Sequence, residues 1–100
     1  MVSQGLIKMA KVIVTMKIMP TSPDVDLTGI EEKTISIIKE FTGETETKTE
    51  IEPIAFGLKA LKILFVMDES KGSTDSVESK VSKIDGINSV EVTDVRRAIG

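Results

Sequence analysis

The sequence contains no cysteine, histidine, tryptophan or tyrosine, and only 3 of its 100 residues are phenylalanine. Without cysteine and histidine the chain has no ligands for a thiolate zinc site or a haem, no cysteine or histidine nucleophile system and no disulfide framework. We therefore expect neither a metal nor a cofactor to be bound. A function without covalent chemistry is favoured, and the chain is not predicted to be an enzyme.

Positive charge is also scarce, since 13 Lys and Arg residues stand against 16 Asp and Glu residues, for a net charge of −3. Proteins that bind nucleic acid depend on dense Lys and Arg to neutralise phosphates, so direct nucleic-acid binding is not expected. No apolar run approaches the ~18 residues of a membrane span, and residues 1–8 lack the apolar core of a signal peptide. We therefore expect a cytoplasmic protein that contacts no membrane.

The remaining composition, with 40% apolar and 29% charged residues, is that of an ordinary folded domain. A chain of 100 residues has the size of one domain and no linker interrupts it, so a single domain over residues 1–100 is expected. Met9 could also serve as a start. Residues 1–8 are therefore expected to form a disordered extension that does not join the fold.

Two hydrophobic periods alternate along the chain and predict its elements. Alternation predicts strands and helical spacing predicts helices, in the order 11–18 (strand), 27–41 (helix), 44–52 and 58–67 (strands), 75–84 (helix) and 87–97 (strand). The strand over 44–52 has one wholly charged side, as at a sheet edge, and 58–67 is apolar on both faces, as in mid-sheet. The order predicts an α+β, ferredoxin-like βαββαβ sandwich, a four-stranded antiparallel sheet with two helices on one face.

Short polar residues precede both predicted helices and indicate their first turns. Thr28 and Glu31 have the spacing of a capping box, and Asp26 is placed to act as a cap and as an acidic partner of the helix dipole. Asp75, with Glu78 three residues later, offers an N-terminal cap for the second helix. Local capping is therefore expected where both helices begin.

The last predicted strand is irregular in its second half, because Asp94 falls in phase with the buried face and Val95 does not. It also carries Arg96 and Arg97, the only arginines of the chain. A solvated chain end is one interpretation of this basic pair, and a pair directed at a binding partner is the other. The adjacent acids at 68–69 are interpreted as a solvated strand end.

Phe56 stands apart from the other phenylalanines, because it falls in the connection over 53–57 rather than in a helix or strand pattern. Burial statistics favour a ring that folds back over the sheet edge. The alternative is an exposed aromatic anchor beside Gly57, since such residues dominate small protein interfaces. The residues alone leave both interpretations open.

Four segments, taken in order along the chain, resemble a known family. They are residues 12–20 (VIVTMKIMP), 25–27 (VDL), 53–61 (PIAFGLKAL) and 66–75 (VMDESKGSTD). They are similar to the translation elongation factor 1-beta family, and in particular to its short archaeal form, which consists of the guanine nucleotide exchange domain alone. The resemblance spans residues 11–99, and the segment Phe-Gly-Leu-Lys at 56–59 is its most specific part.

The resemblance implies a ferredoxin-like domain that promotes GDP release from elongation factor 1-alpha, so that GTP can reload during translation elongation. In eukaryotic relatives the Phe-Gly region contacts the second domain of this partner, and the C-terminal segment enters its nucleotide-binding domain. Carried across, the implied contacts are Phe56, Gly57 and Lys59 for the first region and Arg96, Arg97 and Ile99 for the second. The partner is expected in its GDP-bound and nucleotide-free states, with the exchange factor a monomer.

One position departs from the family pattern. Eukaryotic relatives carry a penultimate lysine that projects into the partner's magnesium site, whereas this position falls at about Gly100 and no lysine follows Lys83. The resemblance therefore does not extend to the lysine itself. Arg96 or Arg97 could supply the positive charge instead.

A function of a different class also remains open at this point. It is a small ferredoxin-like regulatory domain that pairs edge to edge as an oligomer and binds a small ligand or metal between subunits. The charged strand over 44–52 disfavours such pairing. The oligomeric mass in solution would distinguish the two functions.

Overall fold

Over residues 11–43 and 46–98, which the computed structural model describes, the chain forms four strands, two α-helices and two short 3₁₀ turns. In chain order the elements are β1 (Lys11–Pro20), α2 (Leu27–Thr42), β2 (Thr47–Pro53), η1 (Ala55–Gly57), β3 (Lys59–Asp68), η2 (Glu69–Lys71), α3 (Asp75–Ser82) and β4 (Ile87–Ala98). The predicted βαββαβ order is confirmed. The extension expected over residues 1–8 lies outside the described residues.

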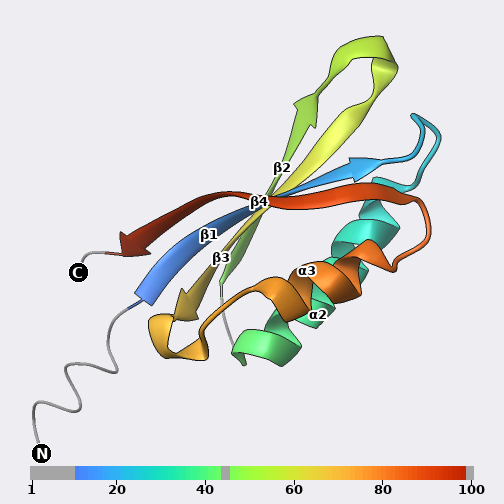
Figure 1. Ribbon diagram of the computed structural model, residues 1–100. Coiled ribbons are helices and arrows are strands. Elements are labelled where there is room, and N and C mark those ends of the chain that lie inside the picture. The colour runs from blue at the N-terminus through green and yellow to red at the C-terminus, as the bar shows by residue number, and fades with distance from the viewer. Residues whose placement is uncertain (1–10, 44–45, 99–100) are drawn as a thin grey trace, which may run out of the picture.

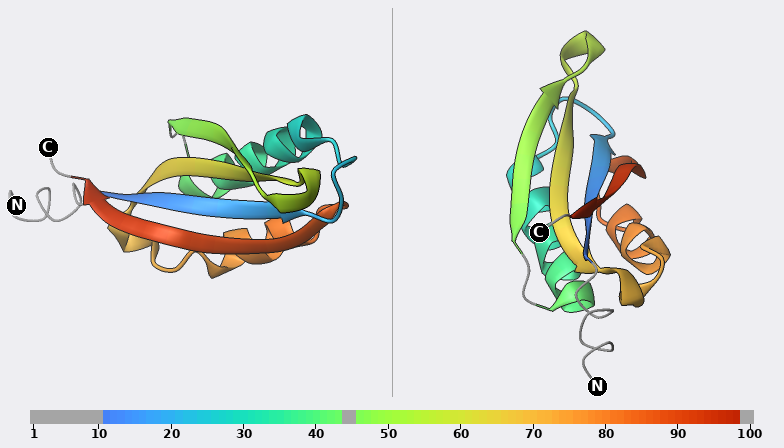
Figure 2. Two further views of the ribbon diagram at one scale, coloured as in Figure 1. Left: turned by 90° about the horizontal axis from the view of Figure 1, so that it is seen from above. Right: turned by 90° about the vertical axis from the view of Figure 1, so that its left-hand side faces the viewer.

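The strands form one antiparallel sheet in the order β2-β3-β1-β4. β2 lies at an edge and β3 lies inside the sheet, so both positions expected from the charge and hydropathy patterns are confirmed. Figure 1 shows α2 and α3 on the same side of this sheet, and the turned views of Figure 2 show how the twisted sheet lies across them. One face of the sheet is therefore covered and the other is open, as a ferredoxin-like sandwich requires.

The core lies between the two helices and the covered face of the sheet. Successive side chains of a strand point to opposite faces, so Val14, Met16 and Ile18 of β1 are buried together. The remaining buried residues of the core come from β1, β3 and the helices: Val12, Leu61, Ile63, Phe65, Met67, Ile30, Ile38, Val77 and Val81. Burial of each such side chain contributes about 1.5–3 kcal/mol relative to exposure, which holds the sheet against the helices.

Helix α2 begins at Leu27, with Asp26 as its N-cap residue. The Asp26 carboxylate accepts a hydrogen bond of 3.1 Å from the backbone N–H of Thr28, which satisfies an amide that the first turn leaves unpaired. The predicted role of Asp26 is therefore confirmed. The predicted capping box of Thr28 and Glu31 is wrong, because Thr28 already lies inside the first turn.

Helix α3 begins at Asp75, so its N-cap is Thr74 and the prediction that Asp75 caps the helix is wrong. The Asp75 amide instead donates to the Ser73 hydroxyl at 3.0 Å, and the Thr74 hydroxyl donates to the Glu78 carboxylate at 2.9 Å. These bonds fix the loop that leads into α3. In the part of the chain that the structure describes, neither helix has the length and apolar character needed to cross a membrane.

Strand β4 contains a β-bulge at Thr93. Val92 and Asp94 pair with consecutive residues of β1, so Thr93 between them has no residue opposite it. Because the extra residue shifts the alternation by one, Asp94 turns to the open face of the sheet and Val95 turns to the helix side. The bulge at Thr93 therefore explains why Asp94 and Val95 break the alternation of buried and exposed residues expected for this strand.

Candidate protein-interaction site

The connection between β2 and β3 is a tight turn that presents Phe56. Its backbone closes through a hydrogen bond of 3.3 Å from the Leu58 N–H to the Ala55 carbonyl oxygen. Phe56 (φ 62°, ψ 31°) and Gly57 (φ 78°) are consecutive residues with positive φ, as in a type I′ turn. The interpretation that the ring folds back over the sheet edge is wrong, because Phe56 is 95% exposed.

The left-handed backbone of Phe56 is unfavourable for a residue of this type. For an L-residue with a Cβ the conformation costs roughly 1–2 kcal/mol, and turns of this kind normally use Gly, Asn or Asp. Burial of the ring does not offset this cost, because almost all of its surface reaches solvent. A strained and exposed aromatic residue that contributes nothing to the fold indicates a role outside the fold.

Gly57 and Lys59 lie in the same turn region as Phe56. The positive φ of Gly57 carries no steric penalty, because glycine has no Cβ. Lys59 is exposed and begins β3 opposite Pro53 of β2. The structure therefore brings all three residues of the first implied contact region together at the tip of the β2–β3 hairpin (Figure 1).

Arg96 and Arg97 lie near the end of β4 and face opposite sides of the sheet. Arg96 pairs across the strands with Ile13 on the open face, whereas Arg97 pairs with Val12, which is buried on the helix side. The structure therefore does not gather the two cations into one basic patch. Ile99, the third residue implied at this end, lies outside the described residues.

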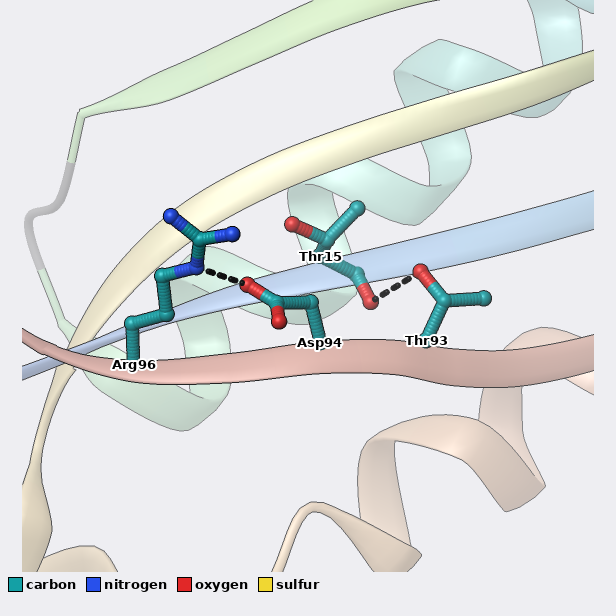
Figure 3. Close-up of polar contacts among 4 residues, drawn as sticks. All are labelled: Thr15, Thr93, Asp94 and Arg96. Atoms are coloured by element: carbon teal, nitrogen blue, oxygen red, sulfur yellow. Dashed lines mark hydrogen bonds and ion pairs between the residues drawn. The ribbon is translucent and has the colours of Figure 1, made fainter.

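Each of these arginines pairs with a carboxylate of the same chain. Arg96 Nε donates to Asp94 Oδ2 at 2.8 Å, as Figure 3 shows, and Arg97 Nη2 donates to Glu69 Oε2 at 2.9 Å. The four side chains are 43–77% exposed, so each pair contributes only about 0–1 kcal/mol to stability. No local sequence pattern relates Glu69 to Arg97, which lies 28 positions later, so this ion pair could not be predicted from the sequence.

Asp68 shapes the turn that carries Glu69. The backbone N–H of Ser70 donates to Asp68 Oδ1 at 2.9 Å, where the chain enters η2. This hydrogen bond, with a further one from the Ser70 side chain and the nearby charges of Lys11 and Lys71, lowers the pKa of the Asp68 carboxyl below its ordinary value. The acids at 68–69 lie at a strand end, as interpreted from the sequence, and Asp68 in addition fixes the turn that follows β3.

An open groove lies beside the Arg97–Glu69 pair, on the helix side of the sheet end. Its volume is about 300 Å³, and it is lined by Val12, Val14, Met67, Glu69, Gly72, Ser73, Thr74 and Val95. Val95 reaches the groove because the bulge at Thr93 turns it to the helix side, and it stays 56% exposed. The end of β4 thus combines apolar surface with charged groups.

The hairpin tip and the end of β4 lie at opposite ends of the sheet, as Figure 1 shows. β3 runs from Lys59 at the tip to Asp68, which is level with the end of β4, and ten residues at about 3.3 Å each give a separation of about 30 Å. The two regions therefore cannot contact one small ligand. Among residues 11–43 and 46–98 there is no group of three or more side chains that could hold a metal ion.

Comparison with known proteins identifies the family. The family model of the EF-1 guanine nucleotide exchange domain matches residues 13–98. The chain is 44% identical over 89 residues to elongation factor 1-beta of Methanothermobacter thermautotrophicus, which covers 89% of this chain and 98% of the relative. It is 40% identical over 90 residues to elongation factor 1-beta of Staphylothermus marinus, with the same coverage of 89% and 98%.

Two solved structures have a similar fold. The de novo designed protein Foldit4 aligns with a TM-score of 0.61 and 16% identity over 90% of this chain and 98% of that one. BlrP1 BLUF aligns with a TM-score of 0.51 and 13% identity over 88% of this chain and 55% of that one, so both likenesses concern the fold alone. From the sequence relatives and the family match, the chain belongs to the EF-1 guanine nucleotide exchange domain family, whose role is guanine nucleotide exchange in translation elongation.

Proposed function

We propose that this protein promotes the release of GDP from elongation factor 1-alpha, after which GTP reloads. Such a factor binds the nucleotide-free partner more tightly than the GDP-bound partner, and GDP weakens its binding by the same factor. A thousandfold loss of nucleotide affinity corresponds to ~4 kcal/mol of differential binding. No covalent bond forms or breaks in this process, which fits a chain without cysteine or histidine.

Two contact regions supply this binding free energy. Residues 56–59 at the hairpin tip anchor the protein on one domain of the partner, and residues 96–99 act at the nucleotide-binding domain. The separation of about 30 Å along β3 fits a partner with two domains. One end of a stiff sheet can then hold the partner while the other end displaces groups around the bound nucleotide.

The observation that carries this proposal is the exposed ring of Phe56. Aromatic residues account for much of the binding energy in small interfaces. Here the ring is 95% exposed on a residue with φ 62°, a conformation that normally belongs to Gly, Asn or Asp. Because the fold gains nothing from this residue, its side chain serves contact with another molecule.

At the other end of the sheet, Arg96 or Arg97 supplies the positive charge that a penultimate lysine supplies in eukaryotic relatives. Each guanidinium group pairs with a carboxylate of its own chain, at 2.8 and 2.9 Å. Exposed pairs of this kind contribute only about 0–1 kcal/mol, so either arginine can exchange its carboxylate for an acidic group or phosphate of the partner at little cost.

The test uses elongation factor 1-alpha loaded with a fluorescent GDP derivative and an excess of unlabelled nucleotide. Added at increasing concentration, the full-length chain should accelerate the loss of fluorescence until the rate reaches a plateau. The concentration at half-maximal rate then reports binding, and the plateau rate reports the displacement step. Release at the spontaneous rate at every concentration would refute the proposed function.

We further propose that the protein acts as a monomer in the cytoplasm. Lys48, Glu50 and Glu52 place alternating charges along the edge strand β2, and charges on an edge strand oppose pairing with the sheet of a second copy. Light scattering during size-exclusion chromatography should give the mass of one chain. A dimer at the concentrations of the exchange assay would contradict this part of the proposal.

A further inference from the structure

We infer that Thr93 is a positioning residue for exchange, because the β-bulge that it forms sets the direction of the last part of β4. This inference rests on the proposed function and concerns how residues 94–98 reach the partner. Thr93 acts through these residues and needs no contact with the partner or the nucleotide.

The geometry of the bulge is visible in the pairing of β4 with β1. Val92 pairs with Met16 and Asp94 pairs with Thr15, which leaves Thr93 without a residue opposite it. Figure 3 shows Thr93 and Asp94 projecting from the same side of β4, whereas neighbours in a regular strand project from opposite sides. The Thr93 hydroxyl also donates to the Thr15 carbonyl oxygen at 3.5 Å, which joins the bulge to β1.

A bulge bends its strand and increases the local right-handed twist. Every residue of β4 after Thr93 is therefore directed away from the path that a regular strand would follow. This bent segment carries both arginines of the second contact region. On its helix side, the Arg97–Glu69 ion pair of 2.9 Å joins the segment to η2 in the free protein.

The extra residue is not needed for the pairing of the sheet. Without Thr93, Val92 and Asp94 would be adjacent and would pair with the same adjacent residues of β1. Asp94 would keep the open face and Val95 would keep the helix side. Because Thr93 is also exposed, it adds no burial to the core, and what it adds to the fold is the bend and the hydrogen bond to Thr15.

The test is therefore a variant in which Thr93 is deleted, assayed for GDP release from elongation factor 1-alpha over a range of concentrations. The plateau rate should fall at least about tenfold, since a misplacement of ~1 Å in an acting group can cost about a hundredfold in rate. The half-maximal concentration should change less than about twofold, because the hairpin tip still binds. A purely structural role would not produce this split.

The chain also offers a matched control in a second bulge of the same strand. Ile87 pairs with Pro20 and Ser89 pairs with Met19, so Asn88 is an extra residue like Thr93 but lies at the other end of β4. Deleting Asn88 should leave the plateau rate at its wild-type value. An equal loss of plateau rate in both deletion variants would overturn the inference, because the effect would then not depend on the direction of residues 94–98.

The remaining outcomes separate this inference from the proposed function. A wild-type chain that does not accelerate GDP release refutes the proposed function, whereas an active wild type with an equally active deletion variant refutes only the role of Thr93. If the deletion variant shows no cooperative melting, Thr93→Gly keeps the extra residue but loosens the bend. That variant should lower the plateau rate about two- to fivefold at an unchanged half-maximal concentration, and a wild-type plateau rate would overturn the inference.

Discussion

The turn at Phe56 permits a test in which stability and function should change in opposite directions. Phe56→Asn removes the ring and introduces a residue that tolerates the left-handed backbone. An ordinary L-residue loses about 1–2 kcal/mol in this conformation, so relief of about 1 kcal/mol is expected. The lost burial is negligible, because Phe56 is 95% exposed and even full burial of a phenylalanine contributes only about 1.5–3 kcal/mol.

The expected result is a higher melting temperature together with weaker binding to the partner. For a domain of this size, 1 kcal/mol corresponds to about 4–8 °C, measured by circular dichroism. Phe56→Ala keeps the strain, because alanine has a Cβ but lacks the short polar side chain through which asparagine hydrogen-bonds the nearby backbone, so its melting temperature should stay close to that of the wild type. Both variants should raise the half-maximal concentration in the GDP-release assay about 30-fold, the equivalent of ~2 kcal/mol for an interface hot spot.

A matched control makes the same replacement at a ring that packs against the core. Phe41 is partly buried against the core, so Phe41→Asn should lower the melting temperature and leave the half-maximal concentration unchanged. The reasoning on strain would be refuted if Phe56→Asn melted clearly below the wild type, because the ring would then contribute to packing. An unchanged half-maximal concentration for Phe56→Asn would show that the ring of Phe56 does not contact the partner.

Three further changes test other parts of the structure. Deleting residues 96–100 should suppress GDP release more than it lowers the melting temperature, since it removes exposed ion pairs and only the last three residue pairs of β4 with β1; a fully active truncated chain would exclude this segment from the mechanism. Asp26→Ala should lower the free energy of unfolding by about 1 kcal/mol in denaturant titrations through loss of the α2 N-cap, and an unchanged value would mean that the Thr28 amide finds another acceptor. The pKa of Asp68 is lowered in the folded state, so its ionised form stabilises the fold at neutral pH, and this stabilisation is lost as the pH falls through the lowered pKa. The melting temperatures of the wild type and Asp68→Asn should therefore differ at about pH 7 and converge as the pH falls toward about 2, whereas a constant difference would contradict the assigned cause.

The predicted strands and helices agree with the structure where the pattern depends on neighbouring residues. Val14 and Met16 alternate with polar residues and are buried in β1, and the charged alternation of β2 does lie at a sheet edge. The starts of the helices were less predictable. Asp26, Thr28 and Thr74 are all good cap residues by type, and the choice among them depends on where the preceding loop enters the helix.

The sequence names residues for a candidate site but not their arrangement. The Phe-Gly-Leu-Lys segment at 56–59 is specific enough to indicate the family, and the family match over residues 13–98 agrees with it. Sequence statistics nevertheless favoured a buried ring at Phe56, because they average over all turns. Exposure in this turn follows from the two positive φ angles that close the hairpin.

By itself, the sequence determined the elements, the edge and central strands, the absence of thiol and imidazole chemistry, and the segments that mark the family. Only the tertiary structure decided that residues 56–59 and the end of β4 lie at opposite ends of the sheet, that Arg96 and Arg97 face opposite sides, and that Glu69 meets Arg97. The physical reason is that hydrophobic periods and caps act within one turn or a few strand residues. The bulge at Thr93, by contrast, depends on how many residues β4 places against a strand that lies 78 positions earlier in the chain.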